Sequence, residues 1–443
     1  MKRKRLLICL CAALMLTGCM KEKVVTQDTV SEITEPPELI PFQPDSDLPE
    51  EKLELPRAYN YIEENQMPAV RNQEGTNTCW AFAALAALES SKDEDATEVY
   101  SAEHLLENNP FGSRFENGGA YVVTMAYLLS WQGPVPEVDE SAEVETSEEP
   151  QVSVHVQEVR QSEPKDYEAI KRMIYLYGGV ESALYMDFDE SMTNSECYNE
   201  ETSAYCYSGE SVSNHDVVIV GWDDDYPAEN FVGNVASDGA FFCLNSWGEN
   251  FGKDGTFYVS YEDVNIGGYG VVYSRIDPVD NYDKIYQSDL CGYTAQIGYE
   301  QETAWFANVY TAEEDSLIRA AGFYATGKNT EYEVYFVSDF SGEDSLKERK
   351  FVCRGNLEDA GYYTIDFPEA LEVFAGKEFA VVVKISTENG EFPVAVECPV
   401  DGLSEKADVS DGKSYLSFQG NLWEHVEETK NYNICLKAYA DIR

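Results

Sequence analysis

The chain of 443 residues is too long for one ordinary hydrophobic core, so two or three domains are expected. Hydrophobic residues make up 43% and aromatic residues 13%, a composition that folds and excludes a disordered chain. The formal net charge of −51 repels phosphate backbones and anionic headgroups, which excludes nucleic-acid binding and attachment to membranes through charge.

The N-terminus predicts export and a lipid anchor. Residues 1–19 combine a basic start with an apolar run over 6–16, which is the pattern of a secretory signal peptide and is too short to span a bilayer. The sequence Leu-Thr-Gly-Cys that ends at Cys19 resembles a bacterial lipobox, which implies cleavage before Cys19 and a diacylglyceryl thioether on its sulfur. The alternative is an ordinary signal peptide that happens to end near a cysteine. Residues 20–54 are acidic and contain prolines, so they are expected to form an extended tether.

Residues 55–280 predict a helical half followed by a half that is mostly β-sheet. Helices are expected over 79–91, from Ser101 onward, over 120–131 and over 167–177, and strands over 180–186, 215–222, 240–245 and 256–261. The acidic stretch at about 136–150 is expected to be a surface loop. Residues 281–443 alternate short apolar strands with turn residues, which predicts a separate β-sandwich of the size of one domain.

Cys79 is the candidate nucleophile. It opens a predicted helix, whose partial positive charge favours the thiolate that a nucleophilic cysteine must form. Of the four histidines, His215 is selected as its partner because the others lie on a helix surface, beside the acidic loop or in the late β region. The separation of 136 positions lies within the ~130–150 expected for such a pair. Asn245 ends another strand and can orient the imidazole through its amide oxygen, and Trp247 can shield that bond from water.

These residues together resemble the papain family of cysteine peptidases. The match consists of Gln73 before Cys79-Trp80, of Asn214-His215 and of Asn245-Ser246-Trp247-Gly248, and it covers about 55–273. The resemblance implies an α+β, two-lobed peptidase with a helical lobe and a β-barrel-like lobe. It implies that Gln73 and the Cys79 backbone N–H form an oxyanion hole, that Cys79 attacks the peptide carbonyl and that His215 protonates the leaving amine. The substrate-binding residues that it implies are Trp80, Gly118, Gly119, Ala183, Asn214, Asp216 and Trp247.

Departures from the family pattern concern a disulfide and a specificity pocket. Thr76-Asn77-Thr78 stands where the family usually has Cys-Gly-Ser, and Glu116 stands where the partner half-cystine is expected, so both halves of that disulfide are missing. Asp216 replaces a small apolar residue of the main specificity pocket, which predicts Lys or Arg two residues before the cleaved bond; the alternative is that Asp216 points to solvent.

The cysteines show no CxxC spacing, which excludes a zinc knuckle, although Cys197 and Cys206 are placed to close a small loop.

The C-terminal part resembles the lectin-like domain of clostridial cell-surface cysteine proteases. The resemblance rests on DNYDKIYQSDLCGYTAQIGY from Asp280 and on the later segments FPVAVECP and GKSYLSFQGNLWE. It implies a β-sandwich that binds cell-wall polymers or other carbohydrate. The acidic loop 408–411 has two interpretations, as oxygen ligands of a structural Ca²⁺ ion or as a solvated turn. Trp423 and Tyr415 either stack on sugar rings or pack in the core. No cofactor or metal is expected to be required for catalysis.

The sequence therefore predicts a secreted endopeptidase, lipid-anchored at the outer surface of a Gram-positive, clostridia-like bacterium, that hydrolyses proteins through a Cys-His-Asn triad. One alternative is a surface adhesin or wall-binding protein whose papain-like part is an inactive scaffold. Another keeps the nucleophile but transfers the acyl group to an amine. The expected partners are protein or peptide substrates and wall polymers, with the membrane contacted only through the lipid and no nucleic acid.

Overall fold

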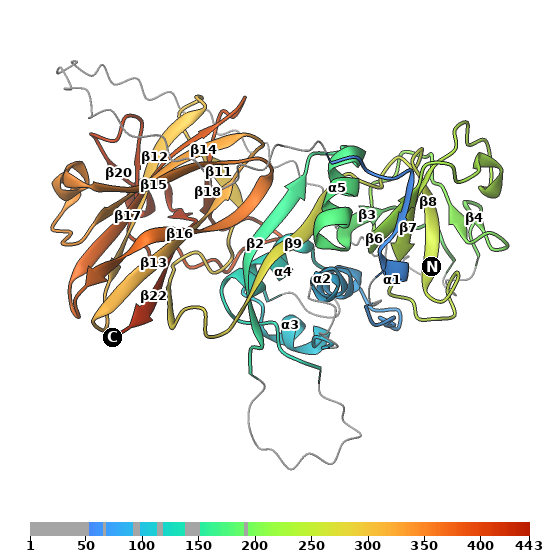
Figure 1. Ribbon diagram of the computed structural model, residues 1–443, viewed down its shortest axis with the longest axis horizontal. Helices are drawn as coiled ribbons and strands as arrows, with labels where there is room; N and C mark the ends of the chain where they lie inside the picture. The colour runs from blue at the N-terminus through green and yellow to red at the C-terminus, as the bar shows by residue number, and fades with distance from the viewer. Residues whose placement is uncertain (1–52, 65–67, 92–97, 113–117, 138–150, 190–193) are drawn as a thin grey trace, which may run out of the picture.

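The computed structural model describes residues 53–64, 68–91, 98–112, 118–137, 151–189 and 194–443. The predicted signal peptide, the tether up to residue 52, Cys19, Glu116 and most of the acidic stretch lie outside the described residues. Figure 1 shows two bodies side by side, with β2 and β9 running between the helices of one and the sheets of the other.

The elements of the first half are β1 (Ala58–Asn60), α1 (Tyr61–Glu64), α2 (Cys79–Ser90), α3 (Ala102–Asn108), α4 (Tyr121–Leu129), β2 (Val154–Ser162), α5 (Tyr167–Tyr177), β3 (Val180–Leu184), β4 (Tyr198–Asn199), β5 (Ala204–Tyr205), β6 (His215–Asp223), the 3₁₀ helix η1 (Ala228–Asn230), β7 (Ala240–Leu244), β8 (Thr256–Ser260) and β9 (Gly270–Pro278). Those of the second half are β10 (Lys284–Tyr286), β11 (Ala295–Ile297), β12 (Thr303–Thr311), β13 (Ser316–Ala325), β14 (Thr330–Val337), the 3₁₀ helix η2 (Glu343–Glu348), β15 (Lys350–Leu357), β16 (Ala360–Val373), β17 (Glu378–Thr387), β18 (Val394–Glu397), β19 (Ser414–Ser417), β20 (Glu424–His425), α6 (Val426–Lys430), β21 (Asn433–Ile434) and β22 (Leu436–Ile442).

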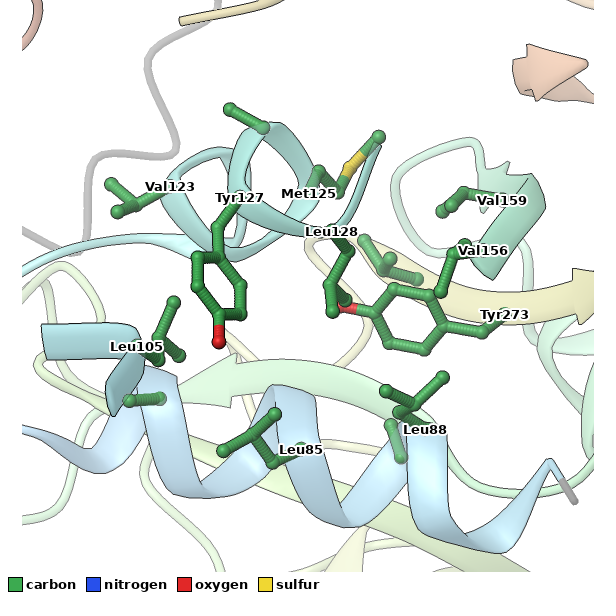
Figure 2. Packing of buried hydrophobic residues seen from close by; sticks show 14 of the residues in the cluster. Leu85, Leu88, Leu105, Val123, Met125, Tyr127, Leu128, Val156, Val159 and Tyr273 are labelled. Carbon is green, nitrogen blue, oxygen red and sulfur yellow. The ribbon is translucent and has the colours of Figure 1, made fainter. Parts of the chain in front are cut away.

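The helical lobe is organised around α2. Ten of its twelve residues are buried, because the sequence CWAFAALAALES is apolar on every side and can be covered from every side. Figure 2 shows Leu85 and Leu88 of α2 facing Tyr127 and Leu128 of α4, with Tyr273 of β9 closing the cluster. The predicted helices over 79–91, from Ser101 and over 167–177 are confirmed, and the helix expected over 120–131 is shorter at both ends.

The β lobe is built on β6, whose first eight residues are all buried. The alternation of its side chains explains this burial: Val218 and Val220 belong to the cluster around α2, whereas Val217 and Ile219 belong to the cluster that contains α5. Strand β3 pairs with β6 on one side and β7 pairs with it on the other. The sheet therefore presents one face to α2, and the ends of β6 and β7 reach the region where α2 begins.

The C-terminal body is a β-sandwich. Its first sheet has the order β15-β14-β17-β12-β19-β20, and it faces strands β10, β22, β13 and β16 together with the small sheet β11-β18-β21. Phe306 and Val381 from the first sheet share a buried cluster with Phe323 from the opposite side. Trp423 and Tyr415 are only 9% and 6% exposed and belong to a core cluster, so core packing is their use. These observations confirm the predicted fold class.

The two bodies share one continuous sheet. Strand β16 pairs antiparallel with β2, so that Ala360–Tyr363 lie opposite Gln161–Glu158, and β2 pairs in turn with β9. The sequence interpretation did not include β2 as a strand, because VHVQEVRQS follows the acidic stretch and has no clean alternation of polar and apolar residues. The sandwich is consequently a structural extension of the first domain, joined to it by main-chain hydrogen bonds.

Charged pairs reinforce this junction, and we expect them to contribute to stability. The Arg172 guanidinium lies 2.7 Å from the Asp359 carboxylate, whose side chain is 1% exposed, and Arg160 approaches the same carboxylate at 3.5 Å. Arg172→Ala should lower the free energy of unfolding by about 2–3 kcal/mol, less than for a fully buried pair, because Arg160 remains. Denaturant unfolding of the whole chain measures this change in the free energy of unfolding. Arg57→Ala removes an ion pair whose side chains are about two-thirds exposed and should leave the curve unchanged; equal effects of the two substitutions would contradict the prediction.

The described cysteines are all free thiols. Cys197 and Cys206 face each other across a hairpin, where the Cys206 N–H donates to the Cys197 carbonyl at 3.1 Å, but no disulfide joins them in this structure. Within the described ranges, no helix combines the length and the apolar character needed to cross a membrane.

Candidate active site

Cys79 occupies the first position of α2 and is 2% exposed. The preceding Thr78 has a non-helical backbone, so the helix starts at the cysteine. The positive end of the helix dipole therefore lies at the thiol, which favours its anionic form.

His215 meets Asn245 at the base of the β lobe. His215 is the first residue of β6 and Asn245 follows β7, and the imidazole Nε2 lies 2.7 Å from Asn245 Oδ1. The backbone N–H of Ser246 also donates to this Oδ1, at 2.8 Å. Because a backbone N–H can only donate, the shared atom is the amide oxygen, and the imidazole must carry its proton on Nε2. The other ring nitrogen, Nδ1, is left for the thiol.

The Cys79 sulfur raises the pKa of the His215 imidazole. Burial alone would lower the pKa of His215, but its hydrogen bond to the Cys79 sulfur and the negative charge there raise that pKa above its ordinary value. Asn245 raises it further by accepting the Nε2 hydrogen bond. The imidazolium consequently persists to higher pH than in a free histidine, together with the thiolate that stabilises it.

Trp247 covers the histidine, as the sequence predicts. The His215 and Trp247 rings lie 4.8 Å apart, and Phe188 and Phe251 pack edge-on against the indole at 5.2 and 5.0 Å. His215 and Asn245 are only 4% and 3% exposed under this aromatic cover. Water is therefore kept away from the hydrogen bond that orients the imidazole.

Gln73 is held in place by Ser246, the residue that follows Asn245. The Ser246 hydroxyl donates to Gln73 Oε1 at 2.7 Å, and the Gln73 backbone N–H donates to the Ser246 carbonyl at 2.9 Å. This arrangement fixes the oxygen end of the amide, so that the Nε2 end is turned away from Ser246, toward the Thr76 carbonyl that it contacts. Sequence reasoning missed this role of Ser246, although its place directly after Asn245 is a visible signal.

The predicted glycine segment packs on Trp80. A Cβ added to Gly119 would lie 2.3 Å from the Trp80 ring, so only glycine lets the backbone pass this close. Trp80 itself is 1% exposed. Trp80 packs beneath Gly119 and supports the glycine segment. This buried packing position takes the place of the substrate contact that was predicted for Trp80.

Asn214 directly precedes β6, which His215 begins, and Ala183 lies on the neighbouring strand β3. The Asn214 side chain accepts from the Met186 N–H at 2.8 Å and donates to the Met186 carbonyl, which ties the end of β3 to the start of β6. Ala183 pairs with Asp216 in the β3–β6 register and is 3% exposed. Asn214 therefore fixes the backbone just before His215, and Ala183 is buried within the sheet beside Asp216.

Asp216 is buried, which excludes the alternative that it points to solvent. It is 1% exposed, and its Oδ1 accepts a hydrogen bond from the Tyr269 hydroxyl at 2.7 Å. Glu181, a diagonal neighbour on β3, is fully buried, and in the described part of the chain neither of its carboxylate oxygens has a hydrogen-bond partner. Burial, followed by the negative charges of Asp216 and Cys79, raises the pKa of Glu181 well above its ordinary value. Sequence reasoning missed Glu181, although a single acidic residue inside the apolar run VESALYM is a visible signal.

Comparisons with known proteins agree with this geometry. Residues 55–273 match the family model described as papain family cysteine protease, and residues 285–440 match that described as lectin like domain. Viral cathepsin of Autographa californica nuclear polyhedrosis virus is 25% identical over 218 residues, which are 48% of this chain and 62% of the relative, so the chain spans less than two thirds of that protein.

Two solved structures resemble nearly the whole described chain. The clostridial cysteine protease Cwp84 after propeptide cleavage is 25% identical, with a TM-score of 0.74 over 87% of this chain and 99% of the other. A structure of the cysteine protease and lectin-like domains of Cwp84, a surface layer associated protein of Clostridium difficile, is 24% identical, with a TM-score of 0.73 over 88% of this chain and 89% of the other. The match includes both domains and their arrangement.

Proposed function

Because residues 55–273 are a papain family cysteine protease domain and residues 285–440 a lectin-like domain, we propose that the protein is an endopeptidase with a Cys79-His215-Asn245 triad. The observation that carries the proposal is the tautomer of His215. Its Nε2 proton is committed to Asn245 Oδ1, and the other nitrogen hydrogen-bonds the sulfur of a cysteine at a helix N-terminus. A scaffold without activity has no need for this arrangement.

The geometry assigns a step to each group. The Cys79 thiolate attacks the carbonyl carbon of the scissile bond, and the oxygen, now negative, is stabilised by the Gln73 amide and the Cys79 backbone N–H. The His215 imidazolium gives its Nδ1 proton to the leaving amine, which departs and leaves a thioester. His215 then takes a proton from water, the hydroxide attacks the thioester, and Cys79 leaves as thiolate. Asn245 holds the imidazole in one orientation throughout.

Incubation with a denatured protein tests the proposal. We expect new peptide termini, identified by mass spectrometry, that fail to appear after an epoxide has alkylated the Cys79 sulfur. Adding a peptide together with an excess of a primary amine separates hydrolysis from acyl transfer, because transfer would give the amide in place of the free acid. An intact substrate together with an unlabelled Cys79 would instead support the adhesin or wall-binding alternative.

We propose that the buried acid pair gives the site a preference for Lys or Arg two residues before the cleaved bond. Asp216 accepts from the Tyr269 hydroxyl, and Glu181 is its diagonal neighbour across the β3–β6 pair, so a cationic side chain that displaces this hydroxyl would pair with the two acids. Asp216→Asn should lower kcat/KM about tenfold for peptides with Lys or Arg two residues before the cleaved bond. For peptides with Leu at that position, kcat/KM should change much less. If a peptide library is cleaved best with bulky apolar residues two positions before the cleaved bond, the proposed preference is contradicted.

We also propose export and a lipid anchor at Cys19, on the strength of the basic start, the apolar run and the Leu-Thr-Gly-Cys sequence. The net charge of −51 supports attachment through lipid, since it opposes attachment through charge. Metabolic labelling with a radioactive fatty acid in a Gram-positive host checks this, because incorporation must disappear in Cys19→Ala.

A Ca²⁺ ion in the lectin-like domain is a further proposal. Four oxygens surround the Asn433 amide nitrogen: the Ser288 carbonyl at 2.7 Å, Glu397 Oε2 and the Asp408 carbonyl at 2.9 Å, and Asp411 Oδ1 at 3.4 Å. An amide nitrogen has two hydrogens and cannot satisfy four acceptors. The buried Asn433 Oδ1 has no partner among the described residues, so rotation of the amide would add a fifth oxygen. Carboxylate, amide and carbonyl oxygens are the ligands that Ca²⁺ prefers, and the residues fit it.

Ca²⁺ should stabilise the chain through this group of oxygens. In the described ranges no three His, Cys, Asp or Glu side chains are grouped as a metal cluster, so the carbonyls and the amide would have to complete the shell. Burial raises the pKa of Glu397 to about 7, and binding needs the carboxylate. The thermal midpoint should therefore rise with Ca²⁺ relative to chelator, and more at pH 8 than at pH 6. The shift should vanish in Glu397→Gln and persist in Asp339→Asn, whose side chain is exposed; a shift unchanged in Glu397→Gln would rule out this site.

A further inference from the structure

A hollow of about 530 Å³ lies at one end of the β-sandwich, in the body coloured orange and red in Figure 1. Three loops form it: the turn between β11 and β12, the turn between β17 and β18, and the segment after β19. Its lining residues are Glu300, Gln301, Glu302, Thr303, Asn389, Gly390 and Phe418. The volume is within the range of small-ligand sites, roughly 300–1,000 Å³.

The hollow is held in shape by hydrogen bonds between the first two loops. The Thr387 N–H donates to the Glu302 carbonyl at 3.0 Å, and the Gln301 N–H donates to the Glu391 carbonyl at 3.2 Å. The Glu302 carboxylate also accepts from the Asn389 N–H at 2.9 Å. A ligand that enters meets a prepared surface and does not bear the entropy cost of ordering these loops.

Phe418 is the apolar part of the hollow. Its side chain is 45% exposed, and its ring meets Tyr299 edge-on at 5.4 Å, so one face of the ring is supported and the rest is open to water. Trp423 and Tyr415, the aromatics that the sequence suggested for sugar stacking, are buried in the core and cannot serve. Phe418 is therefore the aromatic ring that a ligand in this hollow would cover.

The polar part of the lining consists of acceptors and amides. Glu300 and Glu302 are exposed carboxylic acids, Gln301 and Asn389 add amides, Thr303 adds a hydroxyl, and the lining contains no Lys or Arg. Phosphate and uronate groups would be repelled by these carboxylates. Hydroxyl and ammonium donors would be attracted by them. A pyranose ring has this combination, because it presents C–H groups on one face and hydroxyl donors around its rim.

We propose that this hollow binds one hexose of a neutral or amino-substituted glycan, with the sugar face on Phe418 and its donors on Glu300 and Glu302. The proposal rests on carbohydrate binding by the lectin-like domain, which the sequence resemblance implies, and it adds the site and the ligand class. It is independent of the proteolytic step, because the hollow lies in the other body of the chain.

Calorimetric titration of the full chain tests the site. The probes are hexamers of N-acetylglucosamine, of glucosamine and of galacturonate. We expect binding of one or both of the first two and none of the galacturonate. Phe418→Ala should lower the affinity at least tenfold, and Glu302→Gln should weaken binding of the glucosamine hexamer more than that of its acetylated form. Phe374→Ala is the matched control, since it removes a ring of similar exposure, 53% against 45% for Phe418, elsewhere in the sandwich.

The outcomes separate the site from the function. Glycan binding that is unchanged in both Phe418→Ala and Glu302→Gln would overturn this site and leave carbohydrate binding by the domain standing. Binding of galacturonate alone would overturn the ligand class. Failure of the wild type to bind any of the three would overturn the inference together with the carbohydrate role. Glu302→Gln keeps an acceptor for the Asn389 N–H, so it remains informative if Phe418→Ala does not fold.

Discussion

Cys79→Ala is expected to lower kcat/KM for peptide hydrolysis by at least about 10⁴-fold, because it removes the sulfur that attacks the peptide carbonyl in the proposed mechanism. The cysteine lies at the start of α2 and its sulfur is hydrogen-bonded to His215. Alanine removes the attacking atom without adding volume, so the fold and the binding of substrate should persist. The measurement is the initial rate on a fluorogenic peptide, with the circular dichroism spectrum recorded for both proteins.

His215→Ala should cost about as much, and the double variant hardly more, because residues that act as one unit are strongly non-additive. Cys353→Ala is the matched control: it removes another free thiol, on β15 in the sandwich, and should leave the rate unchanged. Hydrolysis retained in Cys79→Ala, or additive losses in the double variant, would mean that the two residues do not form a catalytic pair.

The three residues of the proposed triad can be located from the sequence because each of them lies at the boundary of a regular element. Cys79 begins a helix, His215 begins a strand and Asn245 directly follows one, so element boundaries and hydrophobic patterns place all three. The short motifs around them add the local detail, such as the Ser246 that follows Asn245. Burial of these residues follows from the same apolar runs.

Contacts between distant elements escape sequence reasoning. The pairing of β2 with β16 joins segments about two hundred positions apart, and no local pattern encodes which strand edge meets which. The burial of Glu181 beside Asp216 depends on the register of β3 against β6. The hollow around Phe418 is made by three turns, and turn residues look alike whether they line a site or face water. For Trp423 the difference between core and surface was likewise decided by packing.

Gln73→Ala is expected to lower kcat by about 10²–10³-fold with little change in KM. The amide donates to the oxygen of the substrate only after that oxygen has become negative, so its loss is felt in the transition state and much less in the bound substrate. Gln73→Glu should cost at least as much, because a carboxylate would place an acceptor and a negative charge at the position of the donor. Steady-state kinetics on one peptide, over a range of concentrations that brackets KM, separate the two constants.

Ser246→Ala refines this prediction, because it removes the hydroxyl that holds Gln73 Oε1 at 2.7 Å while leaving the Gln73 amide in place. We expect kcat to fall about tenfold, less than in Gln73→Ala, since the amide can still reach the hole but is no longer fixed in one orientation. Combining the two substitutions should add little to Gln73→Ala alone, because Ser246 acts through Gln73. Losses that multiply in the double variant would instead indicate that Ser246 acts on Asn245 or on the substrate directly, and the orientation of Gln73 would then need another cause.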